Sequence, residues 1–92
     1  MFVAPENYIV FNKGDISDAF YIVLHGEVEV LTVFPDGSEK VVNTLGMGRA
    51  FGERGLIKKA PRSLTVRTTR QTSFIVVKGT LFKKILMKEV NI

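Results

Sequence analysis

Short strand-like runs recur along this chain, and turn residues separate them roughly every ten positions. The clearest runs span residues 20–24, 27–30, 64–68 and 74–77. The continuous apolar run at 20–24 is typical of a buried strand, and the alternation at 27–30 is typical of a strand with one solvated face. Many short strands broken by turns predict a β-sandwich or β-barrel.

The chain offers one clear hairpin and one segment without strand character. Residues 35–38, Pro-Asp-Gly-Ser, predict a hairpin turn, with strand-like residues at 31–34 and 40–45 on either side. Residues 1–7 contain Pro5 and end at Asn7, and we expect them to be a lead-in to a first strand at residues 8–11.

The final segment changes from the period of a strand to the period of a helix. Thr80 is a residue type that caps helices. Apolar residues then recur three and four positions apart, with lysines mostly on the other side: Leu81, Phe82, Ile85 and Leu86 against Lys83, Lys84 and Lys88. This pattern predicts an amphipathic helix that packs on the barrel or on another partner.

Composition excludes several classes of function. The 92 residues include no cysteine and one histidine, His25, so neither disulfide chemistry nor a multi-histidine metal site is available. No apolar run approaches the ~20 residues of a membrane span, and a cytoplasmic setting is our default expectation. Residues 1–46 carry a net charge of −5 and residues 47–92 carry +9. The basic half suits an anionic ligand, nucleic acid or acidic membrane, or is a solvated face.

The basic half opens with the stretch Phe-Gly-Glu-Arg-Gly-Leu-Ile-Lys-Lys-Ala-Pro-Arg-Ser-Leu-Thr-Val at residues 51–66. A glycine-led turn into a short helix presents free backbone N–H groups. Arg62, directly after Pro61, can complete an anion site from the other side. Glu53 would repel the anion, unless it accepts a hydrogen bond from a sugar hydroxyl. The stretch therefore predicts a pocket for a small phosphorylated sugar.

Placed between two strands, this stretch resembles the phosphate-binding cassette of cyclic nucleotide-binding domains. The resemblance runs from about Tyr8 to Leu86. Its motifs are Gly14-Asp15, the strand at 20–23 leading to Gly26-Glu27-Val28, Gly46 and Gly48, Phe51-Gly52-Glu53, and Pro61-Arg62. It implies an eight-stranded jelly-roll β-barrel with a short cassette helix and a C-terminal helix. Residues 1–92 would be one such domain, as part of a larger protein.

The resemblance also implies roles for individual residues. Arg62 would pair with the cyclic phosphate, Glu53 would accept the ribose 2′-hydroxyl, and the backbone of Gly52 would face the sugar-phosphate. Leu56 and Ile57 would couple the cassette to the core or to a moving helix, or are simply core residues. The remaining cassette contacts expected are Phe51, Arg54, Gly55, Leu56 and Pro61.

The choice of base rests on residues next to the cassette arginine. In the family, a hydroxyl residue after that arginine goes with cGMP and alanine goes with cAMP, so Ser63 favours cGMP. Asn43 stands where related sites contact the guanine edge. Arg54 replaces a commonly apolar residue, although the pattern then resembles protozoan cGMP-dependent protein kinases. Leu64 replaces a usual small residue, and its bulk is expected to crowd the ligand or shift the strand, which would weaken binding.

The expected function is regulatory and not enzymatic. The domain would bind cGMP or cAMP, with no other cofactor, and relay binding to an output domain such as a protein kinase. A domain that has kept the fold but lost the ligand, and acts in protein interaction, is the alternative. A cupin-like metalloenzyme is disfavoured because His25 is the only histidine. Nucleic-acid binding is disfavoured because Phe51, Phe74 and Phe82 are expected to be buried rather than free to stack on bases.

Overall fold

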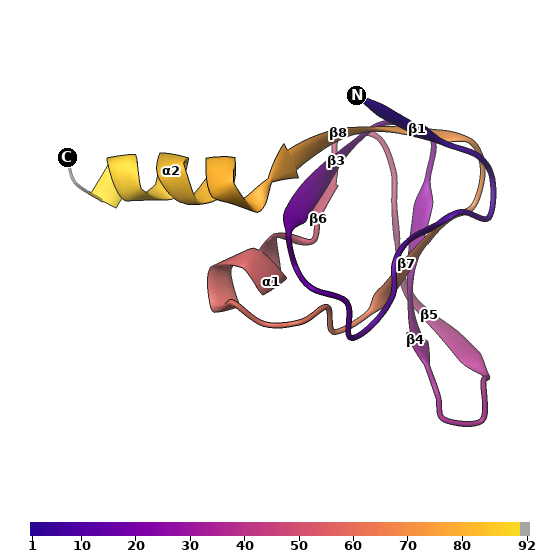
Figure 1. Cartoon of the computed structure of the whole chain (residues 1–92). Coiled ribbons are helices and arrows are strands. Elements are labelled where there is room, and N and C mark those ends of the chain that lie inside the picture. The colour runs from indigo at the N-terminus through magenta and orange to yellow at the C-terminus, as the bar shows by residue number, and fades with distance from the viewer. Residues whose placement is uncertain (91–92) are drawn as a thin grey trace.

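The computed structural model describes the backbone of residues 1–90 and the side chains of residues 1–85. Two four-stranded antiparallel sheets form the body of the molecule, and a longer helix extends from it (Figure 1). The elements are, in order, β1 (Phe2–Ala4), β2 (Ile9–Phe11), β3 (Ala19–His25), β4 (Val28–Val33), β5 (Glu39–Leu45), β6 (Ala50–Phe51), α1 (Glu53–Lys58), β7 (Thr65–Thr68), β8 (Thr72–Lys78) and α2 (Gly79–Val90).

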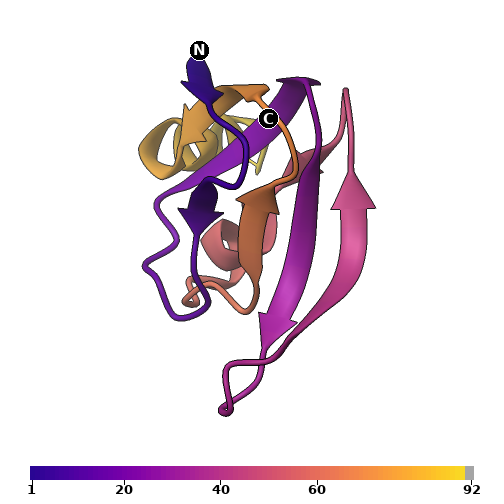
Figure 2. The ribbon, with the colours of Figure 1, turned by 90° about the vertical axis from the view of Figure 1, so that its right-hand side faces the viewer.

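The order of the strands is that of a jelly roll. One sheet runs β1-β8-β3-β6 and the other runs β2-β7-β4-β5. Figure 2 faces the second sheet, with β2, β7, β4 and β5 from left to right. Except for the β4–β5 hairpin, consecutive strands belong to different sheets, so segments far apart in the sequence become neighbours. The predicted mainly β, eight-stranded jelly roll is confirmed.

The core lies between the sheets and is centred on aromatic rings. Phe74 is fully buried, and its ring centroid lies 5.8 Å from that of Phe51 and 6.0 Å from that of Tyr21, both edge-on. Tyr21 and Phe51 stack on each other at 5.1 Å. Such pairs contribute about 0.5–1.5 kcal/mol beyond the burial of area. Phe51 is the last residue of β6, so the chain enters α1 from a position fixed by the core.

The predicted hairpin turn joins β4 to β5. The backbone N–H of Phe34 donates to the Ser38 carbonyl at 2.8 Å, and Gly37 has φ 89°, which a glycine adopts without strain. Asp36 Oδ1 accepts from the Ser38 hydroxyl at 2.6 Å and from its N–H at 2.9 Å. Both hydrogen bonds lower the pKa of the exposed Asp36 carboxyl, and the bond from the Ser38 hydroxyl has the larger effect.

The predicted lead-in at residues 1–7 is wrong, because Phe2–Ala4 form β1 against β8. The Phe2 ring stacks on Phe74 at 6.1 Å, and Ala4 is completely buried. A strand of three residues is too short to show a period in the sequence. Its pairing partner, residues 72–74, lies at the other end of the chain.

The C-terminal helix is confirmed, but its predicted cap is wrong. α2 begins at Gly79, so Thr80 lies inside the helix. The Gly79 N–H donates to the Asp18 carbonyl at 2.7 Å, which fixes the start of the helix to the beginning of β3. Phe82 packs edge-on against Phe20 at 5.2 Å. Leu86 and Lys88, included in the same prediction, lie outside the residues with described side chains. Neither helix of the described chain has the length and apolar character to cross a membrane.

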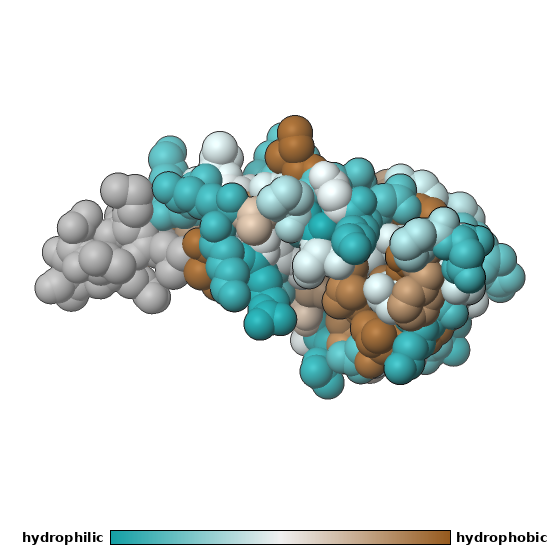
Figure 3. Space-filling model, turned by 90° about the horizontal axis from the view of Figure 1, so that it is seen from below, coloured by the Kyte–Doolittle hydropathy of each residue, from teal (hydrophilic) through white to brown (hydrophobic). Residues whose placement is uncertain are grey.

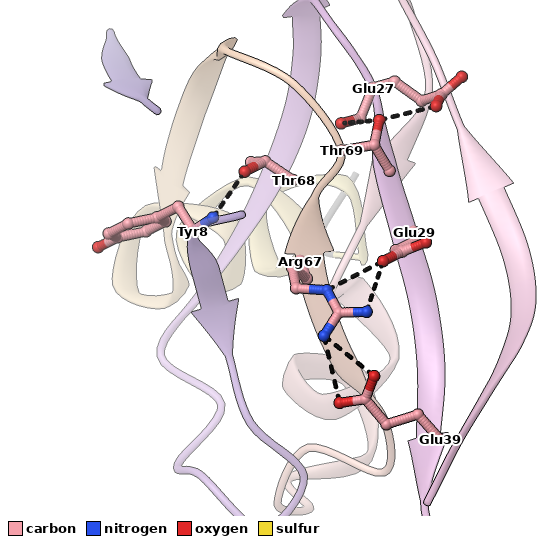
Figure 4. Close-up of polar contacts among 7 residues, drawn as sticks. All are labelled: Tyr8, Glu27, Glu29, Glu39, Arg67, Thr68 and Thr69. Atoms are coloured by element: carbon pink, nitrogen blue, oxygen red, sulfur yellow. Dashed lines mark hydrogen bonds and ion pairs between the residues drawn. The ribbon is translucent and has the colours of Figure 1, made fainter. Parts of the chain in front are cut away.

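Charged residues bridge three strands on the outer face of the second sheet (Figure 4). Arg67 on β7 donates to Glu29 on β4 at 2.7 and 2.9 Å and to Glu39 on β5 at 3.2 Å. The hydrogen bond to Glu29 is the main cause that raises the Arg67 pKa, although desolvation opposes this shift.

At the last residue of β7, the buried Thr68 hydroxyl accepts a hydrogen bond from the Tyr8 N–H at 2.8 Å.

Candidate functional site

The short helix α1 is held between two residues in the left-handed region. Gly52 caps its start with φ 92°, and Lys59 closes its end with φ 52°. Gly55 packs so tightly against Ser17 that a side chain there would collide with it. The Ser17 hydroxyl donates to the Ala60 carbonyl at 2.7 Å, so the loop before β3 holds the end of this turn. The predicted glycine-led turn into a short helix is confirmed.

A cavity of about 550 Å³ lies beside α1, between the cassette and the second sheet. It falls in the range of roughly 300–1,000 Å³ that is usual for small-molecule sites. Figure 3 looks from the side of α1 and the β4–β5 hairpin, where hydrophobic residues gather within a hydrophilic surround. The apolar or small residues of the wall that were not predicted are Phe11, Val30, Leu45, Ala50, Ala60 and Val66.

Arg62 is buried in the wall of this cavity, with 5% of its surface exposed. Its Nη1 donates to the Gly52 carbonyl at 2.8 Å, and its Nη2 donates to the Ala19 carbonyl at 2.6 Å. Its guanidinium carbon lies 4.0 Å from the centre of the Phe11 ring, and Asp18 Oδ1 is 3.8 Å from Nη2. Desolvation lowers the Arg62 pKa, and nearby acidic groups oppose that shift. A guanidinium nevertheless stays protonated in proteins, so the wall keeps a positive charge.

Glycine is required at position 52 for two reasons. Its φ of 92° is costly for other residues, and a Cβ there would lie 2.9 Å from Arg62 Nη1. The same residue therefore starts α1 and leaves space for the guanidinium.

Two buried polar atoms at the cavity have no hydrogen-bond partner among the described residues: Glu53 Oε2 and Arg62 Nε. Leaving such a group unsatisfied costs about 1–3 kcal/mol, and more when it is charged. One atom is an acceptor and the other is a donor. A ligand that offers a hydroxyl hydrogen and an anionic oxygen matches this pair.

The cavity brings together nine of the ten residues predicted to bind the ligand: Asn43, Phe51, Gly52, Glu53, Arg54, Gly55, Pro61, Arg62 and Ser63. Leu56 is the exception. It is buried away from the cavity, and a Cβ on Gly79 would lie 2.9 Å from its Cδ2, so it packs against the start of α2. Ile57, predicted with it as a coupling or core residue, is 60% exposed, so it is not a core residue. Leu64 lines the cavity, which is the position that it must have if its bulk is to affect the ligand.

Sequence reasoning missed two cations that line the cavity, Arg49 and Lys58. The sequence could have indicated Lys58, because it stands four residues after Arg54 in the expected helix and therefore lies on the same helix face as Arg54. Arg49 directly follows Gly48, but only the fold places it at the cavity. The carbonyl of Ala19 and the carboxylate of Asp18, which contact Arg62, are equally invisible to sequence patterns.

Comparison with known proteins agrees with this geometry. The sequence model of the family described as cyclic nucleotide-binding domain matches residues 2–89. The cAMP-dependent protein kinase regulatory subunit of Emericella nidulans is 35% identical over 92% of this chain and 23% of its own length. Lysophospholipase NTE1 of Chaetomium globosum is 32% identical over 91% of this chain and 6% of its own length. This chain thus spans less than a quarter of either relative.

A co-crystal structure of the regulatory domain of Toxoplasma gondii PKA with cAMP superimposes with a TM-score of 0.87. It is 31% identical, over 91% of this chain and 32% of that one. The fold, the site and the sequence define the same class of protein, a regulatory domain built around a phosphate-binding cassette. The chain belongs to the cyclic nucleotide-binding domain family.

Proposed function

We propose that this domain binds a cyclic nucleotide in the cavity beside α1, with the cyclic phosphate on Arg62 and the ribose 2′-hydroxyl on Glu53. The observation that carries the proposal is the unsatisfied pair, Arg62 Nε and Glu53 Oε2, buried in one cavity wall. A cyclic phosphate supplies the acceptor and a ribose supplies the donor. Ligand binding would satisfy both atoms at once.

The proposed base preference is cGMP over cAMP. Ser63 and Asn43 line the same cavity, from the loop after α1 and from β5. Their polar side chains are available to the amino group and edge of guanine. Replacing Ser63 with alanine is expected to reduce the preference for cGMP in a competition against cAMP. An unchanged ratio would remove Ser63 from base selection.

The proposed output is a change in α2 that an attached domain, such as a protein kinase, reads. Leu56 on α1 packs against Gly79 at the start of α2, and this contact supports a path by which movement of the cassette would reach the helix. A ligand that favours one arrangement of this pair shifts its population. The regulatory subunit from Emericella nidulans supports a kinase as the output.

The test is a thermal-shift titration with cGMP and with cAMP. A ligand at 100 times its Kd stabilises the native state by about 2.7 kcal/mol, and for a domain of this size each kcal/mol raises the Tm by about 4–8 °C. A rise on the order of 10 °C or more is therefore expected. Glu53→Ala and Arg62→Ala should each lose most of this rise.

A second candidate function is a protein-interaction module that has lost the ligand. Leu64 favours it, because this side chain occupies the cavity wall next to Ser63. The same titration separates the two functions. No shift with either nucleotide at millimolar concentration would support the interaction module and reject the binding site.

A further inference from the structure

Three cations besides Arg62 line the cavity: Arg49, Arg54 and Lys58. Arg54 and Lys58 stand four residues apart on α1, which puts both on one face of the helix. Arg49 directly precedes β6. All three side chains are exposed, whereas Arg62 is buried, so they surround the mouth while Arg62 forms part of the wall.

The lining residues have a large excess of positive charge. The four cations face one carboxylate, Glu53, which leaves a net charge of +3. The ion pairs within the described chain engage only Arg62 and Arg67 as cations, so Arg49, Arg54 and Lys58 have no carboxylate partner there. Like charges gathered at a concave surface raise the local potential and attract anions. A cyclic mononucleotide has one negative charge, which Arg62 would already match.

We propose that the cavity takes a nucleotide with two phosphate groups, the first on Arg62 and the second on Arg49, Arg54 and Lys58. The proposal rests on the proposed function, because Arg62 and Glu53 must first hold one nucleotide unit. Two diester phosphates, with one negative charge each, would lower the excess charge from +3 to +1, and a terminal phosphate monoester would lower it further. Charge-assisted bonds to phosphate are the strong class of hydrogen bond that arginine forms.

Two kinds of nucleotide share this chemistry. One is a cyclic dinucleotide, in which both phosphates are diesters. The other is a linear dinucleotide that carries a terminal phosphate. Because the side chains of Arg49, Arg54 and Lys58 line the cavity and are exposed, a second unit bound to them would extend from the cavity toward solvent.

The test is calorimetric titration of the whole chain at low and at physiological salt. The ligands are cGMP, cyclic di-GMP, the linear dinucleotide pGpG, and inorganic pyrophosphate as a control for charge alone. If each exposed contact contributes on the order of two- to fivefold, one of the dinucleotides should bind about 10- to 100-fold more tightly than cGMP at low salt. The dinucleotide that shows the gain identifies the kind of ligand.

The decisive variant is the double substitution Arg49→Gln and Lys58→Gln. It should reduce the ratio between the dissociation constants of cGMP and the better dinucleotide about tenfold. The charge-matched control is Lys78→Gln with Lys84→Gln, two exposed lysines that do not line this cavity. The control should leave the ratio as in the wild type.

The outcomes separate the two proposals. If cGMP binds but neither dinucleotide binds more tightly, the second-phosphate site is wrong and the proposed function stands. The same conclusion follows if the gain survives Arg49→Gln with Lys58→Gln, or if the Lys78 and Lys84 control removes it equally. If Arg49→Gln with Lys58→Gln weakens the binding of pyrophosphate but leaves that of the dinucleotide unchanged, the cations are a general anion surface and the proposal is overturned. If no nucleotide binds, both proposals fail.

Discussion

Arg62→Lys is the most informative substitution, because Arg62 has a structural contact on two sides before any ligand arrives. Its two terminal nitrogens donate to carbonyls on β3 and at the start of α1, at 2.6 and 2.8 Å. A lysine ammonium is a point charge without the planar fork of a guanidinium. It can therefore keep one of these bonds, but not both in the same geometry.

The expected loss can be worked from these contacts. A hydrogen bond to a charged group contributes about 1.5–3 kcal/mol, and a buried carbonyl left without a donor costs about 1–3 kcal/mol. The Arg62 side chain is only 3% exposed, so solvent does not screen the change. We expect the free energy of unfolding to fall by about 2–3 kcal/mol and the Tm by roughly 10–20 °C.

The assay is urea and thermal unfolding of the ligand-free protein, followed by circular dichroism. Arg70→Lys is the matched control, since the Arg70 side chain is exposed, and it should change stability by less than about 0.5 kcal/mol. Titration with cGMP should then show an affinity about tenfold lower or worse for Arg62→Lys. If Arg62→Lys unfolds within 0.5 kcal/mol of the wild type, at an unchanged denaturant slope, the reasoning about the two carbonyls is refuted.

Three further predictions concern glycines and charges. Gly52→Ala should cost about 1–2 kcal/mol from its positive φ alone, and should also weaken cGMP binding in calorimetry; full affinity would contradict the crowding at 2.9 Å. Gly26→Ala should destabilise by about 2–4 kcal/mol, because its Cβ would meet the Thr72 Cα at 2.7 Å. Gly14→Ala has a similar φ but nothing within 4 Å, so equal losses in chemical denaturation would exclude crowding at Gly26. A double-mutant cycle of Arg67→Met and Glu29→Gln should give a coupling of about 0.5–1 kcal/mol that shrinks in 1 M salt; a salt-independent coupling would argue against an ion pair.

Sequence patterns predicted the architecture well because most strands carry their own signal. The run at 20–24 and the alternation at 27–30 became β3 and β4, and the turn at 35–38 joined the expected strands. The predictions that failed concern elements whose local sequence pattern is too short or too weak to indicate them. β1 has three residues and depends on pairing with β8, and α2 starts one residue before the predicted cap because Gly79 bonds to Asp18.

In the candidate site, too, the residues with a local sequence pattern were predicted, and those placed only by the fold were not. Residues within the cassette were predicted because their types and order carry chemistry, and eight of these nine line one cavity, together with Asn43 from β5. The sequence left Leu56 as either a ligand contact or a core residue, because it does not say which face of a single helical turn points to the core. The structure buries Leu56 away from the cavity. Arg49 was missed because it lies outside the cassette, and only the pairing of β6 with β3 puts it at the cavity.

The hydrogen bonds at the start of β3 have a consequence for amide exchange. The carbonyl of Asp18 accepts the Gly79 N–H, and the next carbonyl along, that of Ala19, accepts Arg62. One short piece of backbone therefore holds both the first amide of α2 and the cassette arginine. The hydrogen–deuterium exchange rate of the Gly79 amide should then change when Arg62 engages a ligand, although Gly79 does not line the cavity. This amide is a natural reporter of occupancy that requires no attached fluorophore and no attached domain.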